Sequence, residues 1–189
     1  MSQRKLTTSF AEKSPDKRLG ELMLYVAWKC ADDPKFGATK LNKILYFSDF
    51  LSFLRTGEAI TGSEYVKQKN GPIPKHLVPV RESLESKKEA SIQRRQTLSG
   101  YEQHRLIALR EPDLSCFSAQ EITFVDKVIT ALEAHNATQV SELSHNRIWR
   151  VASMGESIPY EAVFVSDSDP NESDVRRAKT LIREHGWAV

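Results

Sequence analysis

Residues 39–57 predict a helix that is apolar almost all the way round, and this feature constrains the fold more than any other. At about 100° per residue, its apolar side chains fall on two opposite sides and on the strip between them: Leu41, Ile44, Leu45 and Leu51 on one side, Tyr46, Phe50 and Phe53 on the other, and Phe47 and Leu54 between. Only Asn42 and Asp49 form a narrow polar strip. Such a helix belongs at the centre of a fold, with other elements packed around it. We expect Thr39 to cap this helix and Gly57 to end it in a left-handed turn.

Asp49 is the one acidic residue on this helix that invites a catalytic interpretation. A buried carboxylate can be tuned for proton transfer. The alternative, which we favour, is that Asp49 and Asn42 accept or donate hydrogen bonds to a neighbouring loop, as buried polar groups must.

The rest of the chain predicts a mostly helical α+β domain with a small antiparallel sheet. A helix over 14–33 is expected to begin at Ser14 and Pro15. Residues 64–69 predict a short strand, 70–74 a Gly-Pro turn, and 91–111 two strands joined around Ser99–Gly100. We expect the two 91–111 strands to form a small antiparallel sheet, either alone or with 64–69 as a third strand. Further helices are predicted from about Pro79, after a capping box at 118–121, from Thr138 toward Trp149, and from Asp169 to Gly186. Residues 155–167 fit either a brief strand or irregular structure.

Length and charge narrow the class of protein. At 189 residues the chain fits one domain, over 14–189, preceded by a flexible arm at 1–13. The formal net charge is only +2, which makes a nucleic-acid partner unlikely. Two distant cysteines, no leader-like segment and no apolar run of about 20 residues indicate a soluble, cytoplasmic protein that does not enter a membrane.

A search for catalytic chemistry in the sequence finds no constellation. The five histidines are scattered, and no Cys-x-x-Cys or His-Glu-x-x-His spacing supports a metal site. There is no Gly-x-Ser-x-Gly elbow and no glycine-rich phosphate loop. His145, four residues before Trp149, is read as a packed side chain. We therefore expect no cofactor, no metal and no catalytic residue, so the protein is predicted not to be an enzyme.

The segment from Lys40 to Pro74 resembles the Panacea domain, the family that includes SocA-like antitoxins and phage-associated proteins. The matching residues are Lys40, Leu41, Lys43, Ile44, Leu45, Tyr46, Phe47, Gly57, Ile60, Thr61, Gly62, Tyr65, Gly71 and Pro72. The later segment "LSHNRIWRVA", with Leu143, Ser144, His145 and Trp149, is similar to the family's downstream part. One departure is the polar run "KQKN" directly before Gly71, where many relatives carry an aromatic residue.

The resemblance implies a bacterial or phage antitoxin whose partner is a cognate protein toxin. Neutralisation by direct binding is the leading hypothesis. A proteolytic adaptor, which would also bind a protease, and an enzyme that reverses the toxin's modification remain alternatives. For the partner-binding surface we predict the strand and turn from Tyr65 to Ile73, through Tyr65, Lys67, Lys69, Asn70 and Ile73, with Lys43 as a neighbour. An exposed strand edge there could pair with an extended segment of the toxin. If this surface is not the interface, the 92–110 hairpin is the next candidate.

Overall fold

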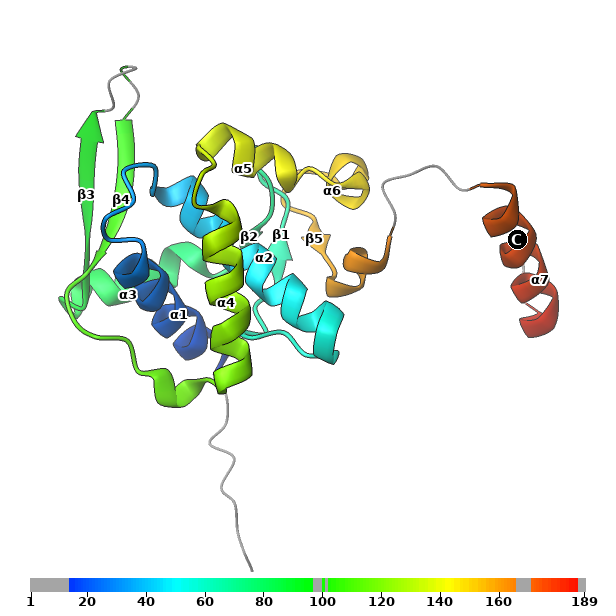
Figure 1. Ribbon diagram of the computed structural model, residues 1–189, viewed down its shortest axis with the longest axis horizontal. Helices are drawn as coiled ribbons and strands as arrows, with labels where there is room; N and C mark the ends of the chain where they lie inside the picture. The colour runs from blue at the N-terminus through cyan, green and yellow to red at the C-terminus, as the bar shows by residue number, and fades with distance from the viewer. Residues whose placement is uncertain (1–13, 97–99, 101, 166–170, 187–189) are drawn as a thin grey trace, which may run out of the picture.

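The computed structural model describes residues 14–96, 100, 102–165 and 171–186 (Figure 1). Its elements are α1 (Pro15–Lys29), α2 (Ala38–Thr56), β1 (Tyr65–Val66), β2 (Ile73–Pro74), α3 (Leu77–Ser86), β3 (Ala90–Gln96), β4 (Glu102–Ala108), η1 (Leu114–Cys116), α4 (Ala119–Leu132), α5 (Ala137–Leu143), α6 (Arg147–Val151), β5 (Ser157–Ile158), η2 (Tyr160–Phe164) and α7 (Glu172–His185). The predicted class, a mostly helical α+β fold with small antiparallel sheets, is confirmed. Residues 1–13 lie outside the described residues, so the predicted arm stays a prediction.

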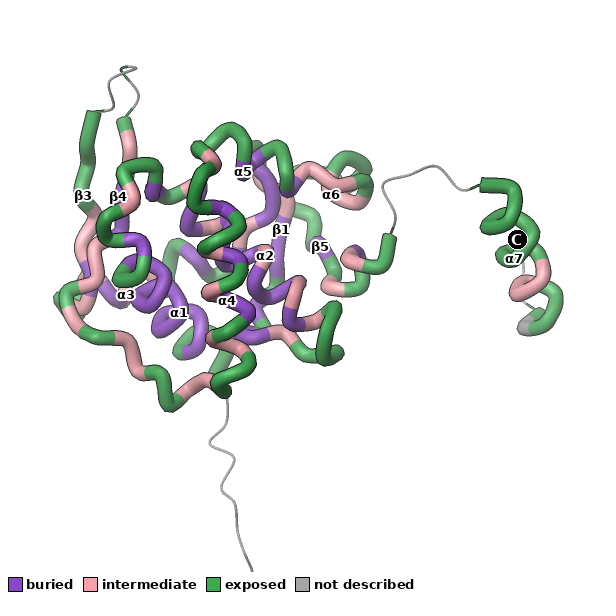
Figure 2. Tube along the Cα trace, in the orientation of Figure 1, coloured by how far each residue is buried: buried purple, intermediate pink, exposed green. Residues whose placement is uncertain are grey.

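Helix α2 lies at the centre of the fold, as its apolar circumference predicts. One side packs Ile44 and Leu45, both fully buried, into the main core with α1 and α4. The other side places Tyr46 and Phe50 in a second cluster with Tyr65. Figure 2 shows the buried stretches of α1 and α2 surrounded by more exposed elements. The central helix therefore joins two apolar clusters.

The two ends of α2 differ from each other in how well the sequence predicts them. Gly57 ends the helix in the left-handed region, with φ of 78°, as predicted. The expected cap at Thr39 is wrong, because Gly37 occupies the N-cap position. The Leu41 amide already donates to the Gly37 carbonyl at 2.9 Å, so helical hydrogen bonding begins before Thr39.

The strands form two separate sheets, so 64–69 is not a third strand beside the two strands of 91–111. β3 and β4 pair with each other in an antiparallel hairpin, from Ala90 opposite Ala108 to Gln96 opposite Glu102. β1 lies in the middle of the other sheet, between β2 and β5. The second partner of β1 is β5, at residues 157–158, so β1 does not pair with the hairpin of β3 and β4.

Several helix starts also differ from prediction. Helix α3 begins at Leu77 with His76 as N-cap, and Pro79 fits inside its first turn, where a missing amide costs little. Asn136, not Thr138, caps α5 through a reciprocal pair with Gln139. The predicted helix toward Trp149 is two helices, since Asn146 caps α6 separately. The capping box of α4 at Ser118 and Glu121 is confirmed.

The C-terminal part of the chain leaves the body after η2. Asn171 caps α7, and Gly186 ends it with φ of 63°. The predicted cap at Asp169 and first helical residue at Pro170 lie outside the described residues, although the helix is present. Figure 1 shows α7 standing away from the other helices. Within the described ranges, no helix is long and apolar enough to cross a membrane.

Candidate functional site

A buried lysine of α2, Lys43, donates a hydrogen bond to the Gly-Pro turn between β1 and β2. The Lys43 side chain is only 1% exposed, and its Nζ donates to the Pro72 carbonyl at 2.7 Å. Burial lowers the pKa of this lysine to about 7, because the charged form loses its hydration. Lys43 therefore supports the turn from inside the core.

Gly71 is required at this turn for two reasons. Its φ of 96° is a conformation that side-chain-bearing residues rarely adopt. A Cβ at this position would also lie 2.1 Å from Ser144 Oγ and 2.6 Å from Lys43 Nζ. The backbone thus approaches the lysine and α5 more closely than any other residue type permits.

Helix α5 supplies the next contacts under the turn. Ser141 Oγ donates to the Asn70 carbonyl at 3.0 Å. Ser144, which is 1% exposed, donates to the Ser141 carbonyl at 2.7 Å. Two small hydroxyl side chains three residues apart therefore let the turn lie directly on the helix.

Helix α6 fixes the start of the turn through Trp149. The indole Nε1 donates to the Gln68 carbonyl at 3.2 Å, and the ring stacks on His145 with centroids 3.6 Å apart. The Lys67 Nζ lies 4.4 Å from the Trp149 ring centroid and donates to the Ala152 carbonyl at 2.8 Å. We call Lys43, Ser141, Ser144 and Trp149 together the turn clamp.

The turn clamp leaves only part of the predicted partner surface accessible. Lys69 and Asn70 are exposed, whereas Lys67 and Ile73 are half-buried. Lys43 and Tyr65 are buried, at 1% each, so neither side chain lies on the accessible part of the predicted surface. Their polar atoms instead reach groups inside the fold.

The expected free strand edge at Tyr65–Lys69 is also absent. β1 pairs with Pro74 and Ile73 of β2 on one side and with Ile158 and Ser157 of β5 on the other. The Lys67 amide donates to the Glu156 carbonyl at 2.9 Å. Because its own chain occupies both edges of β1, addition of a partner strand to β1 is not available.

A polar cleft of about 690 Å³ connects the two surfaces that the sequence suggested for partner binding. Asn70 lies on one side, and Gln103 and His104 of β4 lie on the other. The N-terminal ends of α2 and α5, at Thr39 and Asn136, also line it, as do the charged residues Lys35 and Glu102. The turn and the hairpin are therefore neighbours across one cleft.

Asp49 sits in a hydrogen-bond web that fits the structural interpretation. It is fully buried and accepts hydrogen bonds from the Thr61 amide at 2.7 Å, the Thr61 hydroxyl and the Tyr65 hydroxyl at 2.8 Å. Burial raises the pKa of Asp49, and these donors oppose that rise. The carboxylate ties α2 to the strand that leads into the turn. Asn42 is half-buried.

The motif residues predicted to be structural lie where that role requires. Leu41, Ile44, Leu45 and Tyr46 are buried, and Phe47 and Trp149 are half-buried against the apolar clusters or the turn. Lys40, the first motif lysine, is 1% exposed and donates to Asp33 at 2.7 Å and to the Glu133 and His135 carbonyls at the end of α4. Both motif lysines, Lys40 and Lys43, are thus buried and join α2 to neighbouring segments through hydrogen bonds.

Ser141 is the one clamp residue that the sequence did not single out. Its hydroxyl lies 3.4 Å from His145 Nε2, but it donates to the Asn70 carbonyl. Burial, together with the nearby Lys43 charge, lowers the pKa of His145. A small residue three positions before Ser144 on the same helical face is the only sequence signal that could have indicated Ser141. Within the described ranges, no group of three or more potential metal ligands is present.

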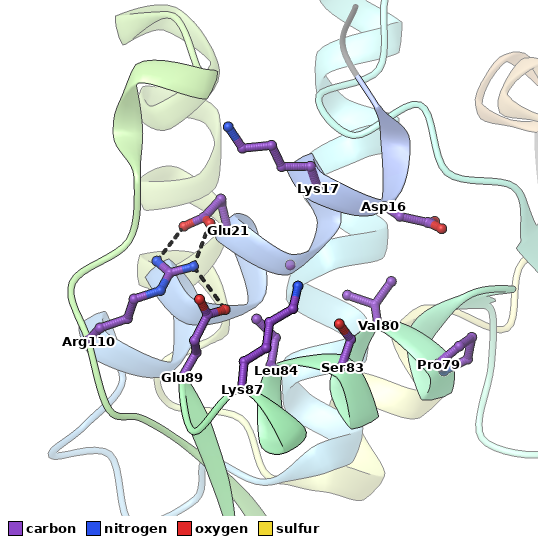
Figure 3. Close-up of a pocket in the computed structure, with 11 residues that line it drawn as sticks. Asp16, Lys17, Glu21, Pro79, Val80, Ser83, Leu84, Lys87, Glu89 and Arg110 are labelled. Carbon is purple, nitrogen blue, oxygen red and sulfur yellow. Dashed lines mark hydrogen bonds and ion pairs between the residues drawn. The ribbon is translucent and has the colours of Figure 1, made fainter.

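A second polar cluster lines a cavity of about 310 Å³ between α1 and α3 (Figure 3). Arg110 bridges Glu21, at 2.6 and 2.8 Å, and Glu89, at 3.3 Å. Burial alone would raise the pKa of Glu21, but hydrogen bonds from Arg110 and the Asp113 amide hold it below its ordinary value. This network anchors the hairpin and the loop after it to α1.

The structure is a mostly helical α+β domain built around α2, and Lys43 of this helix supports the Gly-Pro turn as part of the turn clamp. A family model described as "Antitoxin SocA-like, Panacea domain" matches residues 41–150, more than half of the chain. The chain belongs to this family, which confirms the resemblance. Its role is accordingly of the antitoxin type, with a protein as the expected kind of partner. No curated protein and no solved structure matches the chain.

Proposed function

We propose that the protein neutralises a cognate protein toxin by binding it directly, through the surface that Lys69 and Asn70 form at the mouth of the polar cleft. The observation that carries this proposal is the convergence of family-motif residues beneath that surface. Lys43, Gly71 and Ser144, which are far apart in the sequence, meet under Asn70. Their common effect is to fix the shape of an exposed polar turn.

A fixed turn suits recognition, because little conformational freedom is lost when the partner binds. Lys69 offers a cation and Asn70 an amide, and the hairpin across the cleft adds Gln103 and His104. Of the charged residues that line the cleft, Lys35 adds a second cation and Glu102 one acidic group. Such a surface favours an acidic or carbonyl-rich segment of the toxin. The charge of Lys69 would act mainly on the rate of association.

Neutralisation by binding needs no turnover. We expect toxin activity to fall in proportion to added protein and to reach zero near a one-to-one ratio. The measurement is a titration of purified toxin with purified antitoxin in the absence of any protease. Complete silencing by about a tenth of an equivalent would contradict the proposal and favour an enzyme that reverses the toxin's modification. Inhibition that appears only when a protease is added would favour the adaptor.

The surface itself is tested by the double substitution Lys69→Glu with Asn70→Ala. The toxin to use is the protein product of the adjacent reading frame, with affinity measured by calorimetry. We expect binding to weaken at least about tenfold while the melting temperature stays the same, since neither side chain is buried.

The matched control is Lys127→Glu with Gln120→Ala, which makes the same charge change at exposed positions of α4. Its affinity should equal that of the unaltered protein. Unchanged affinity of the Lys69→Glu, Asn70→Ala variant would overturn the proposed surface and direct attention to the outer end of the hairpin at Arg94 and Arg95.

A further inference from the structure

An apolar groove of about 510 Å³ lies on a different part of α2 from the turn clamp. It runs between α2, α4, α5 and η2, and among its lining residues are Leu51, Leu54, Ala131, Leu143, Val163 and Val165. Leu54, Leu143 and Val165 are 42%, 55% and 44% exposed. Among the described residues, no charged side chain lines the groove. A continuous apolar surface of this kind usually has an occupant.

Helix α7 carries an apolar stripe that is only partly covered in the structure, with Leu181 and Ile182 half-buried. Val175, Ala178, Leu181 and Ile182 follow helical spacing and occupy one face, while the other positions are mostly charged. Val175 is 43% exposed, and Ala178 is exposed as well. A helix of 14 residues is only marginally stable in water unless such a face is buried.

The groove and the stripe match in length and are joined by a short connection. Val175 to Ile182 spans about 10 Å along α7, and Phe47 to Leu54 spans about the same distance along α2. Five residues, 166–170, separate Val165 from the cap of α7 at Asn171. Because Val165 itself lines the groove, this connection keeps the start of α7 within about 20 Å of it.

We infer that α7 docks with its apolar stripe in this groove and covers it in the free protein. A short tether gives an effective concentration of about 1 mM. An intrinsic dissociation constant of about 0.1 mM would then keep the helix docked about nine-tenths of the time. The same short tether favours the chain's own helix over that of a second copy. The inference goes beyond the proposed function and concerns a different surface.

Hydrogen exchange of the α7 amides in the full-length protein, without toxin, tests this docking. An undocked helix of this length exchanges nearly as fast as unfolded chain, whereas docking should slow the amides of residues 175–182 about tenfold. Replacing the stripe by Leu181→Lys with Ile182→Lys keeps good helix formers and should remove the protection. The control Arg176→Lys with Thr180→Lys alters the opposite face and should retain it.

The reciprocal test alters the groove. Leu143→Lys should release α7, and Leu109→Lys, at a residue that is also 55% exposed but on the hairpin side of the fold, should not. Rapid exchange of α7 in the unaltered protein, or protection that survives Leu143→Lys, would overturn the inference. Protection that disappears on dilution from about 100 to about 1 µM would show that a second copy, not the same chain, fills the groove.

Discussion

The buried ammonium of Lys43 lies 2.7 Å from the carbonyl oxygen of Pro72 and so joins the central helix to the Gly-Pro turn. In the folded protein its pKa is about 7, against 10.5 for an ordinary lysine. The depressed value arises because burial removes water from the charged group, and the hydrogen bond that Nζ donates to the Pro72 carbonyl compensates for only part of that loss.

This relationship predicts that stability rises with pH above neutrality. Between about pH 7 and 10.5 the unfolded chain binds the Lys43 proton more tightly than the folded one, so raising the pH favours folding. Below pH 7 both states are protonated, and the full cost of burying the charge remains. From pH 7 to 9, urea unfolding should show a gain of about 2 kcal/mol. Lys43→Met should abolish most of this slope, and equal slopes in the two proteins would contradict the assignment.

Gly71→Ala should lower the free energy of unfolding by about 3 kcal/mol or more, because it adds both backbone strain and a collision with Ser144. Gly62→Ala is the matched control: its φ is also positive, at 69°, but no atom lies within 4 Å of the new Cβ. It should cost only about 1 kcal/mol. Equal losses in denaturant unfolding would mean that the close approach under the turn is unimportant.

Leu45→Ala should destabilise the protein by about 2–5 kcal/mol, since its side chain is fully buried in the main core. Leu114→Ala, at a residue that is 42% exposed and lies outside the apolar groove, should cost less than about 1 kcal/mol. Thermal and urea unfolding of both variants measure the difference. A Leu45→Ala protein as stable as the unaltered one would rule out α2 as the core helix.

Asp49→Ala should cost about 3 kcal/mol, because it leaves the Thr61 amide and the Tyr65 hydroxyl buried without an acceptor. The Thr61 hydroxyl can still donate to Ser63 Oγ, at 2.9 Å. Tyr65→Phe removes one donor together with its hydrogen bond and should cost about 1 kcal/mol. Urea unfolding at pH 7 compares them. If Asp49→Ala lowers the free energy of unfolding less than Tyr65→Phe does, the hydrogen bonds to Asp49 do not stabilise the fold.

The sequence predicted the parts of the fold that depend on local pattern. The position of α2 follows from its apolar circumference, and the left-handed end at Gly57 and the capping box at Ser118 depend on neighbours within one turn. Two caps were missed although the sequence contains their signal. Asn136 with Gln139, and Asn171 with Asp174, have the three-residue spacing that reciprocal capping needs.

Parts of the site that depend on distant partners could not be predicted. A lysine in a sequence counts as polar and exposed, and the burial of Lys43 follows only once the Pro72 carbonyl and α5 lie around it. The expectation that β1 has a free edge was not met for a similar reason. Its second neighbour, β5, is a two-residue strand, which is too short to produce a periodic pattern.

The pairing of β1 with β5 has a consequence for the order in which the turn and its supporting contacts form during synthesis. Lys69 and Asn70 are made well before Ser141, Trp149 and Ile158, which support the turn and its strand. At about 5–20 residues per second, the interval is roughly ten seconds. A nascent chain therefore carries the turn before it carries the turn's support, and the turn first has a fixed shape after Ile158 has been made.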